Sequence, residues 1–150
     1  MELKNCRVCN GNSFMPYLNL GSTPAADAFV KEELKNLTDP VYPLEVCLCN
    51  NCGISQLNFT VDPKILYQND YPYESSTTNT GRQHFEDFGD SVVKKAKLNS
   101  NDLVIDIGSN VGVLLGAYKK RGCKVLGIEP SKHIAESANI NGIETINDFT

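Results

Sequence analysis

Residues 103–112 read Leu-Val-Ile-Asp-Ile-Gly-Ser-Asn-Val-Gly, an apolar run that ends in an acid and a glycine-rich turn. The first five of them predict a strand too apolar to face water on either side, and such strands are typical of parallel sheets that are covered on both faces. Residues 113–120 then predict a helix, which a basic last turn and Gly122 end. The stretch therefore predicts the first strand, turn and helix of an α/β domain.

The same rhythm continues on both sides of this stretch. Residues 124–128 predict a second strand, Ser131 is placed to cap a helix that runs to about residue 139, and residues 143–146 predict a third strand. Connections of this length join parallel strands with right-handed crossovers. Upstream, residues 79–97 place apolar side chains at helical spacing and predict an amphipathic helix.

The turn carries the candidate cofactor-binding residues. Asp106 precedes it, Gly108, Asn110 and Gly112 lie in it, and Glu129 ends the next predicted strand. Glycines let a backbone pass close to a ligand at a helix N-terminus, and an acid about 20 residues further on accepts hydrogen bonds from ribose hydroxyls. A carboxylate at position 106 repels a pyrophosphate and attracts an ammonium or sulfonium group, which favours S-adenosylmethionine over NAD. The alternative is that the glycines only shape a structural turn and that Glu129 is a solvated strand end.

Five of the six cysteines lie in the first 52 residues. Cys6 and Cys9 form one C-x2-C pair and Cys49 and Cys52 another, a spacing that lets thiolates converge on a tetrahedral Zn²⁺. Two disulfides are the alternative, but the chain starts without an export signal, so we expect a reducing compartment and structural zinc. Cys47 competes with Cys49 for the third ligand position, and we prefer Cys49 because a one-residue gap closes a zinc turn poorly.

Composition excludes several classes of function. The 150 residues carry 14 basic and 18 acidic side chains, a net charge of -4, so nucleic acid is not an expected partner. The longest apolar run, residues 111–118, is far shorter than a membrane span requires. Together with the absence of an apolar signal at the N-terminus, this predicts a cytoplasmic protein without a membrane partner.

Several motifs, in this order along the chain, resemble the sugar C-methyltransferases. They are Cys6-Arg7-Val8-Cys9, Leu18-Asn19-Leu20-Gly21-Ser22-Thr23-Pro24, residues 43–46 with the Cys49 to Leu57 segment, Tyr71-Pro72-Tyr73-Glu74-Ser75-Ser76, His84-Phe85 and residues 106–112. The chain departs from the family at Val111, where the family commonly has Asp. The resemblance implies a zinc-binding N-terminal domain, a Rossmann-like class I methyltransferase sheet, and methylation, through an enolate, of a carbon in a nucleotide-linked 4-keto-deoxysugar.

The resemblance also implies roles for individual residues. The methionine part of S-adenosylmethionine would be surrounded by Asp106, Gly108, Asn110 and Gly112, the ribose by Glu129 and Pro130, and the adenine by Asp148 and Phe149. The sugar pocket would be bordered by Tyr71, Tyr73 and Ser75, whose alternative role is a packing hinge. Family members continue beyond residue 150, and no catalytic base is identified in this chain.

The expected organisation is a zinc-binding domain of short strands and loops over residues 1–72, a connecting segment with the amphipathic helix over 73–98, and the first βαβαβ part of the cofactor sheet over 99–150. The far edge of the 103–107 strand is left without a partner, and a bare apolar edge promotes aggregation. We therefore expect a fragment of a longer enzyme that is inactive alone, or an edge covered by self-association with another copy. Two other readings stay open: a zinc-ribbon interaction module and an NAD-binding enzyme fragment.

Overall fold

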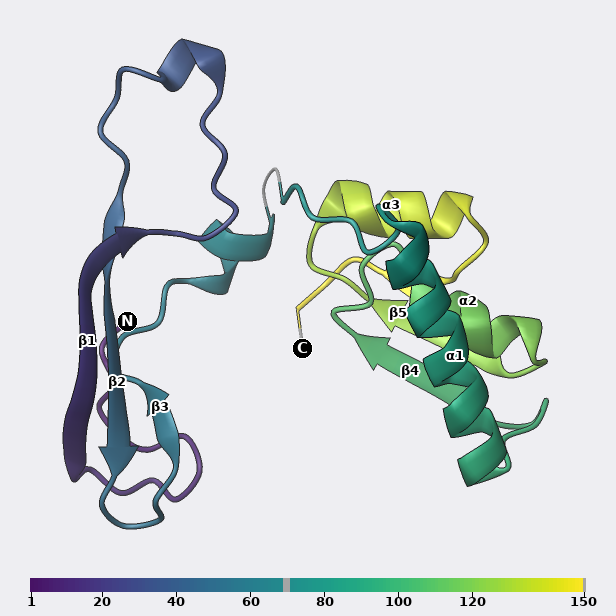
Figure 1. The fold of residues 1–150 in the computed structure, drawn as a ribbon, viewed down its shortest axis with the longest axis horizontal. Helices are drawn as coiled ribbons and strands as arrows, with labels where there is room; N and C mark the ends of the chain where they lie inside the picture. The colour runs from purple at the N-terminus through teal and green to yellow at the C-terminus, as the bar shows by residue number, and fades with distance from the viewer. Residues whose placement is uncertain (69–70, 150) are drawn as a thin grey trace. The chain divides into compact units, whose positions relative to one another are not determined.

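The chain forms two compact units in a computed structural model, Met1–Leu66 and Tyr67–Thr150 (Figure 1). The structure describes residues 1–68 and 71–149. The predicted domain ranges 1–72 and 99–150 also include residues 69, 70 and 150, which lie outside the described residues. Across the described ranges, no helix combines the length and the apolar character that crossing a membrane would demand.

The first unit is an antiparallel sheet with the strand order β1-β2-β3. Its strands are β1 (Phe14–Pro24), β2 (Val41–Cys49) and β3 (Ser55–Leu57), and a short 3-10 helix, η1 (Glu32–Leu34), lies in the connection between β1 and β2. The register between β1 and β2 shifts twice, which leaves β1 irregular. A π-helical segment, η2 (Lys64–Gln68), follows the sheet in the sequence.

The first unit buries almost no apolar side chains. The residues of this unit that are buried, among those described, are three cysteines: Cys6, Cys47 and Cys49. A unit of this size without a core needs a disulfide or a metal to hold its loops. All six cysteines of the chain are free thiols, so the structure provides no disulfide for this purpose.

The second unit is a parallel sheet with helices, as predicted. The strand order is β4-β5-β6, and both strand pairs are parallel. The elements follow one another as α1 (Asn79–Ala96), β4 (Leu103–Ile107), α2 (Val113–Lys120), β5 (Lys124–Ile128), α3 (Lys132–Ile140) and β6 (Thr145–Ile146). This alternation confirms the predicted α/β fold, a partial Rossmann-like sheet preceded by an amphipathic helix.

The prediction that β4 is buried on both faces is wrong. Leu103, Ile105 and Ile107 are 54%, 52% and 65% exposed, whereas Val104 packs against the hydrophobic core. The connections β4-α2-β5 and β5-α3-β6 both run in the same direction across the sheet. Because such connections share the same right-handed sense, α2 and α3 lie on the same face of the sheet. Alternate side chains of β4 therefore face the helices, and the others remain in water within the described residues.

Helix α1 packs closely on α2. A Cβ atom at Gly89 would lie 2.8 Å from the Cβ of Ala117, so glycine lets the two helices approach. Glu86 and Asp90 on α1 form ion pairs with basic residues at the end of α2, including a 3.2 Å contact from Arg121 Nη1 to Glu86 Oε2. The core beneath them contains Leu115, Tyr118, Cys123, Ala138 and Ile143.

Replacing Gly127 by Ala should lower the free energy of unfolding by about 1–3 kcal/mol, the usual cost of overpacking. Gly127 lies in the middle strand β5, where an added Cβ would be 2.5 Å from Ser109 Oγ and 2.7 Å from Thr145 Oγ1. Urea unfolding followed by helical circular dichroism measures this change, because the three α-helices found in residues 1–68 and 71–149 belong to the second unit. The control is Gly116→Ala in α2, where nothing lies within 4 Å of the added Cβ and we expect stabilisation by about 0.5–1 kcal/mol. Equal effects of the two substitutions would contradict the packing described here.

Candidate functional site

The turn after β4 depends on left-handed backbone conformations. Gly108, Asn110 and Gly112 have φ angles of 76°, 53° and 77°. Such angles are strained for residues with a Cβ, although Asn tolerates them better than most. At Gly112 an added Cβ would also lie 2.8 Å from Ile143. The glycine pattern therefore reflects backbone geometry and close packing at the start of α2.

Glu129, which directly follows β5, binds the backbone of this turn through its side chain. Its side chain is 4% exposed. Oε2 accepts a 2.9 Å hydrogen bond from the backbone N–H of Asn110, and Oε1 accepts one of 2.9 Å from the N–H of Ser131. Ser131 does precede α3, but its hydroxyl makes no cap and instead lies 3.1 Å from His133 Nδ1. The predicted side-chain cap is therefore wrong, and Glu129 binds the backbone at this position.

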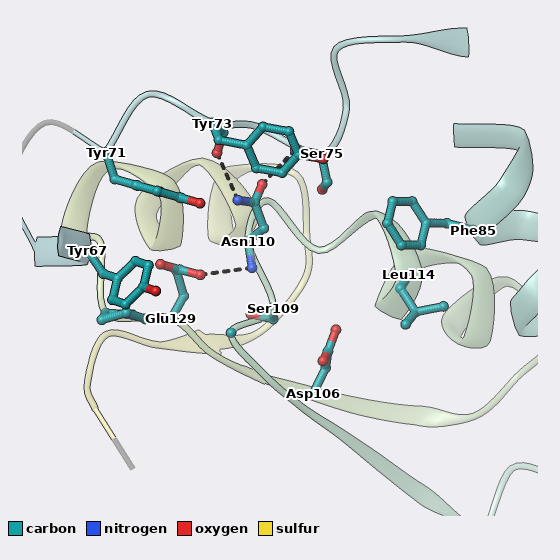
Figure 2. A pocket seen from close by; sticks show the side chains of 12 residues that line it. Tyr67, Tyr71, Tyr73, Ser75, Phe85, Asp106, Ser109, Asn110, Leu114 and Glu129 are labelled. Atoms are coloured by element: carbon teal, nitrogen blue, oxygen red, sulfur yellow. Dashed lines mark hydrogen bonds between the residues drawn. The ribbon is translucent and has the colours of Figure 1, made fainter. Parts of the chain in front are cut away.

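A cavity of about 420 Å³ opens above the turn, within the second unit (Figure 2). Such a volume suits a small ligand. The fold brings together eight of the residues that the sequence marked: Asp106, Gly108, Asn110, Glu129, Pro130, Tyr71, Tyr73 and Ser75. Gly112, Asp148 and Phe149 are not among the residues that line the cavity.

Four further residues line the cavity that sequence reasoning did not assign to it: Tyr67, Phe85, Ser109 and Leu114. Phe85 and Leu114 come from α1 and α2 and form an apolar side of the cavity near Asp106 (Figure 2). In the sequence, both carry the periodicity of core-facing helix residues. No local signal distinguishes a helix residue that faces a cavity from one that faces the core.

The cavity is acidic. Its lining contains the carboxyl groups of Asp106 and Glu129 and, within the described part of the chain, no Lys or Arg. Burial, and then the charge of Glu129, raise the pKa of Asp106 above its ordinary value. A bound cation would reverse this penalty, because it favours the ionised carboxyl group.

Replacing Asp106 by Asn should raise the free energy of unfolding at neutral pH. A raised carboxyl pKa means that the folded state binds the proton more tightly than the unfolded state, so the wild-type chain loses stability as pH rises from the ordinary value of 3.8 through the folded pKa. The gain from the substitution should vanish below that ordinary value and grow as pH rises through the folded pKa. Urea unfolding at both pH values, read by helical circular dichroism, measures it.

The matched control is Asp87→Asn, on the exposed side of α1, which should change stability by less than about 0.5 kcal/mol. If Asp106→Asn were destabilising at neutral pH, the electrostatic description of the cavity would be wrong.

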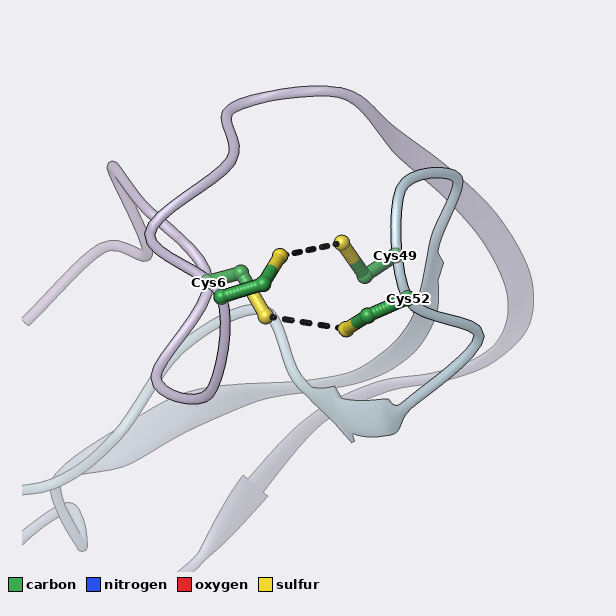
Figure 3. Close-up of side chains that lie close together, drawn as sticks. Cys6, Cys49 and Cys52 are labelled. Carbon is green, nitrogen blue, oxygen red and sulfur yellow. Dashed lines mark hydrogen bonds between the residues drawn. The ribbon is translucent and has the colours of Figure 1, made fainter.

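The second candidate site is a cluster of four cysteines in the first unit (Figure 3). The sulfur atoms of Cys6, Cys9, Cys49 and Cys52 all lie within 4.8 Å of one another. The Cys6–Cys52 and Cys9–Cys49 sulfurs are 3.7 Å and 3.6 Å apart. A tetrahedral Zn²⁺ with bonds of about 2.3 Å separates its sulfur ligands by about 3.8 Å, so the cluster has the dimensions of a zinc site.

Cys47 lies outside this cluster. It is fully buried, and its thiol donates to the carbonyl oxygen of Gln56 at 3.5 Å. Burial raises the pKa of the Cys47 thiol, which disfavours the thiolate that a metal needs. The arrangement therefore separates the two cysteines that the sequence leaves in competition.

The electrostatics of the cluster also suit a cation. The backbone N–H of Cys9 lowers the pKa of Cys6 to about 6, against the effect of burial. The N–H of Gly11 favours the Cys9 thiolate, but the sulfurs of Cys52, Cys49 and Cys6 together with burial outweigh it and raise the pKa of Cys9 to about 12. Thiolates gathered at this spacing would repel one another, and a bound divalent ion would relieve that repulsion.

Two comparisons with known proteins found similar sequences. Residues 6–67 match the family model described as "Putative zinc binding domain". The chain is 31% identical over 144 residues to the C-methyltransferase NovU of Streptomyces niveus, an alignment that covers 96% of this chain and 34% of that relative. The predicted resemblance to a C-methyltransferase with a zinc-binding domain is therefore confirmed. The chain spans about a third of the length of the curated relative that it matches.

Proposed function

We propose that the chain is part of an S-adenosylmethionine-dependent methyltransferase and holds one half of its cofactor site. The observation that carries the proposal is the acidic cavity above the glycine turn, in a chain that resembles a C-methyltransferase along 96% of its length. In this proposal residues 1–72 are the zinc-binding domain and residues 99–150 belong to the cofactor domain. Residues 73–98 are the connecting segment between the two domains.

The charge of the cavity favours S-adenosylmethionine over NAD. Asp106, Gly108, Asn110 and Gly112 would surround the methionine part, where the carboxylate of Asp106 attracts the ammonium and sulfonium groups. Glu129 and Pro130 would face the ribose. Each oxygen of Glu129 accepts one hydrogen bond in the structure and retains capacity for a ribose hydroxyl. A pyrophosphate would meet two carboxyl groups and no basic side chain from this lining.

The metal proposal assigns Zn²⁺ to Cys6, Cys9, Cys49 and Cys52. Four thiolates fill a tetrahedral coordination sphere and leave no position for an activated water, so the metal has a structural role. Metal binding of roughly 10 kcal/mol or more can stabilise a unit that lacks a core. The support for this role is that cysteines are the buried residues of the first unit, as described above.

For the substrate we propose a nucleotide-linked 4-keto-deoxysugar, bordered by Tyr71, Tyr73 and Ser75. S-adenosylmethionine supplies an electrophilic methyl group when it is bound. A base takes the proton from the carbon next to the ketone, and that carbon then forms the new C–C bond as the methyl–sulfur bond breaks. We place the base outside this chain, and the chain alone is expected to be inactive.

The outer edge of β4 completes the proposal. Within the described residues β4 pairs with β5 alone. We propose that a further strand of a longer enzyme, or a second copy of the chain, covers this edge, because an unpaired apolar edge promotes association.

Zinc analysis of two cysteine variants tests the metal site. The wild-type chain should contain one Zn²⁺, measured by mass spectrometry of the metal. Cys49→Ser should lower the zinc affinity at least a hundredfold, because it removes one of four thiolates from the coordination sphere. Chelation of the wild-type metal should unfold the first unit, seen by loss of its dispersed amide NMR signals.

Cys47→Ser is the matched control, since Cys47 is also buried and lies two residues from Cys49. It should keep one Zn²⁺. Full zinc content in Cys49→Ser, or its loss in Cys47→Ser, would show that the ligand assignment is wrong.

Calorimetry tests the cofactor. S-adenosylmethionine and S-adenosylhomocysteine should bind, and NAD should not. Asp106→Asn should weaken binding about ten- to a hundredfold, as the loss of a charge-assisted hydrogen bond predicts, while Asp87→Asn should not. Heat from NAD alone would support the NAD-binding reading, and heat from none of the three would support an interaction module.

A further inference from the structure

The side chain of Asn110 makes three hydrogen bonds within the protein. Its Oδ1 accepts hydrogen bonds from the backbone N–H of Ser75 at 2.8 Å and from that of Val111 at 2.9 Å. Its Nδ2 donates to the carbonyl oxygen of Tyr73 at 2.9 Å. Figure 2 shows the amide of Asn110 reaching from the turn to the segment that carries Tyr73 and Ser75. Three of the four hydrogen-bonding positions of this amide are therefore used within the protein.

The segment held by Asn110 forms one wall of the cavity. Residues 73–75, which we call the strap, lie outside any helix or strand and contribute Tyr73 and Ser75 to the lining. A segment without regular structure owes its position to side-chain and turn contacts. Asn110 supplies two of these contacts, and it lies 35 positions beyond Ser75 and 37 beyond Tyr73 along the chain.

The same residue is tied to the floor of the cavity. The backbone N–H of Asn110 donates to Glu129, and its left-handed φ of 53° turns the side chain toward the strap while the N–H faces the carboxylate. One residue therefore connects Glu129, the glycine turn and the strap.

We propose that Asn110 is a positioning residue that ties the strap to the glycine turn. A ligand bound over the turn and Glu129 then orders the strap, whose Tyr73 and Ser75 border the site of the methyl acceptor. This inference rests on the proposed function for the identity of the ligand. The connection between turn and strap stands on the hydrogen bonds alone. Asn110 acts through the strap and does not touch the reacting atoms.

Hydrogen exchange of the ligand-free chain tests the connection. Asn110→Gly keeps the left-handed backbone and the N–H to Glu129 but removes both bonds to the strap. The amides of residues 73–75 should then exchange about tenfold faster or more, as expected when two hydrogen bonds are lost, and the amides of β5 should not change. Asn141→Gly, at the exposed residue that follows α3, is the matched control and should leave the strap unchanged. Equal exchange of the strap in the wild-type and Asn110→Gly chains would overturn the proposal.

A second arm repeats the measurement with saturating S-adenosylhomocysteine. In the wild-type chain the ligand should slow exchange of the strap several-fold. In Asn110→Gly the ligand should still protect the turn, but the strap should gain no protection. Equal protection of the strap in both chains would overturn the coupling. If S-adenosylhomocysteine binds neither chain, the proposed function and the coupling fall together, whereas the ligand-free arm has already decided the role of Asn110.

Discussion

The buried carboxylate of Glu129 organises the edge of the sheet on which the candidate site is built. A buried charge is costly unless hydrogen bonds compensate for it. Here the compensation comes from the N–H groups of Asn110 and Ser131, which lie in the loops after β4 and β5. In parallel sheets the carboxyl ends of the strands meet at one edge, so a single side chain can fix both loops. The shape of the glycine turn therefore depends on an acid 19 positions further along the chain than Asn110.

The same edge gathers negative charge at the expense of stability. Burial raises the pKa of Asp106, and the charge of the nearby Glu129 raises it further. Natural proteins retain such unfavourable groups where a ligand uses them. The combination of two carboxyl groups, aromatic side chains and left-handed glycines supports the proposal of a cationic ligand over the proposal of a purely structural turn.

The two units are stabilised by different physical means. The second unit has an apolar core between its helices and sheet, centred on Leu115 and Tyr118. The first unit has no such core among the described residues, and its buried residues are three cysteines. Four of its cysteine sulfurs lie at the spacing of a metal site. Loss of a metal should thus affect the first unit far more than the second, because the core of large apolar side chains in the described residues lies in the second unit.

Local pattern alone predicts the helices and strands of the second unit, the glycine turn and the two cysteine pairs, because periodicity, backbone freedom and metal-ligand spacing are properties of neighbouring residues. It misassigns the outer face of β4 and the hydroxyl of Ser131, and it does not find Tyr67, Phe85 or Leu114 at the cavity. Those features depend on which face the helices cover and on which groups meet across the fold. Two partners of the Asn110 amide, Ser75 and Tyr73, are 35 and 37 positions away, and only packing in three dimensions brings such distant groups within reach of a hydrogen bond.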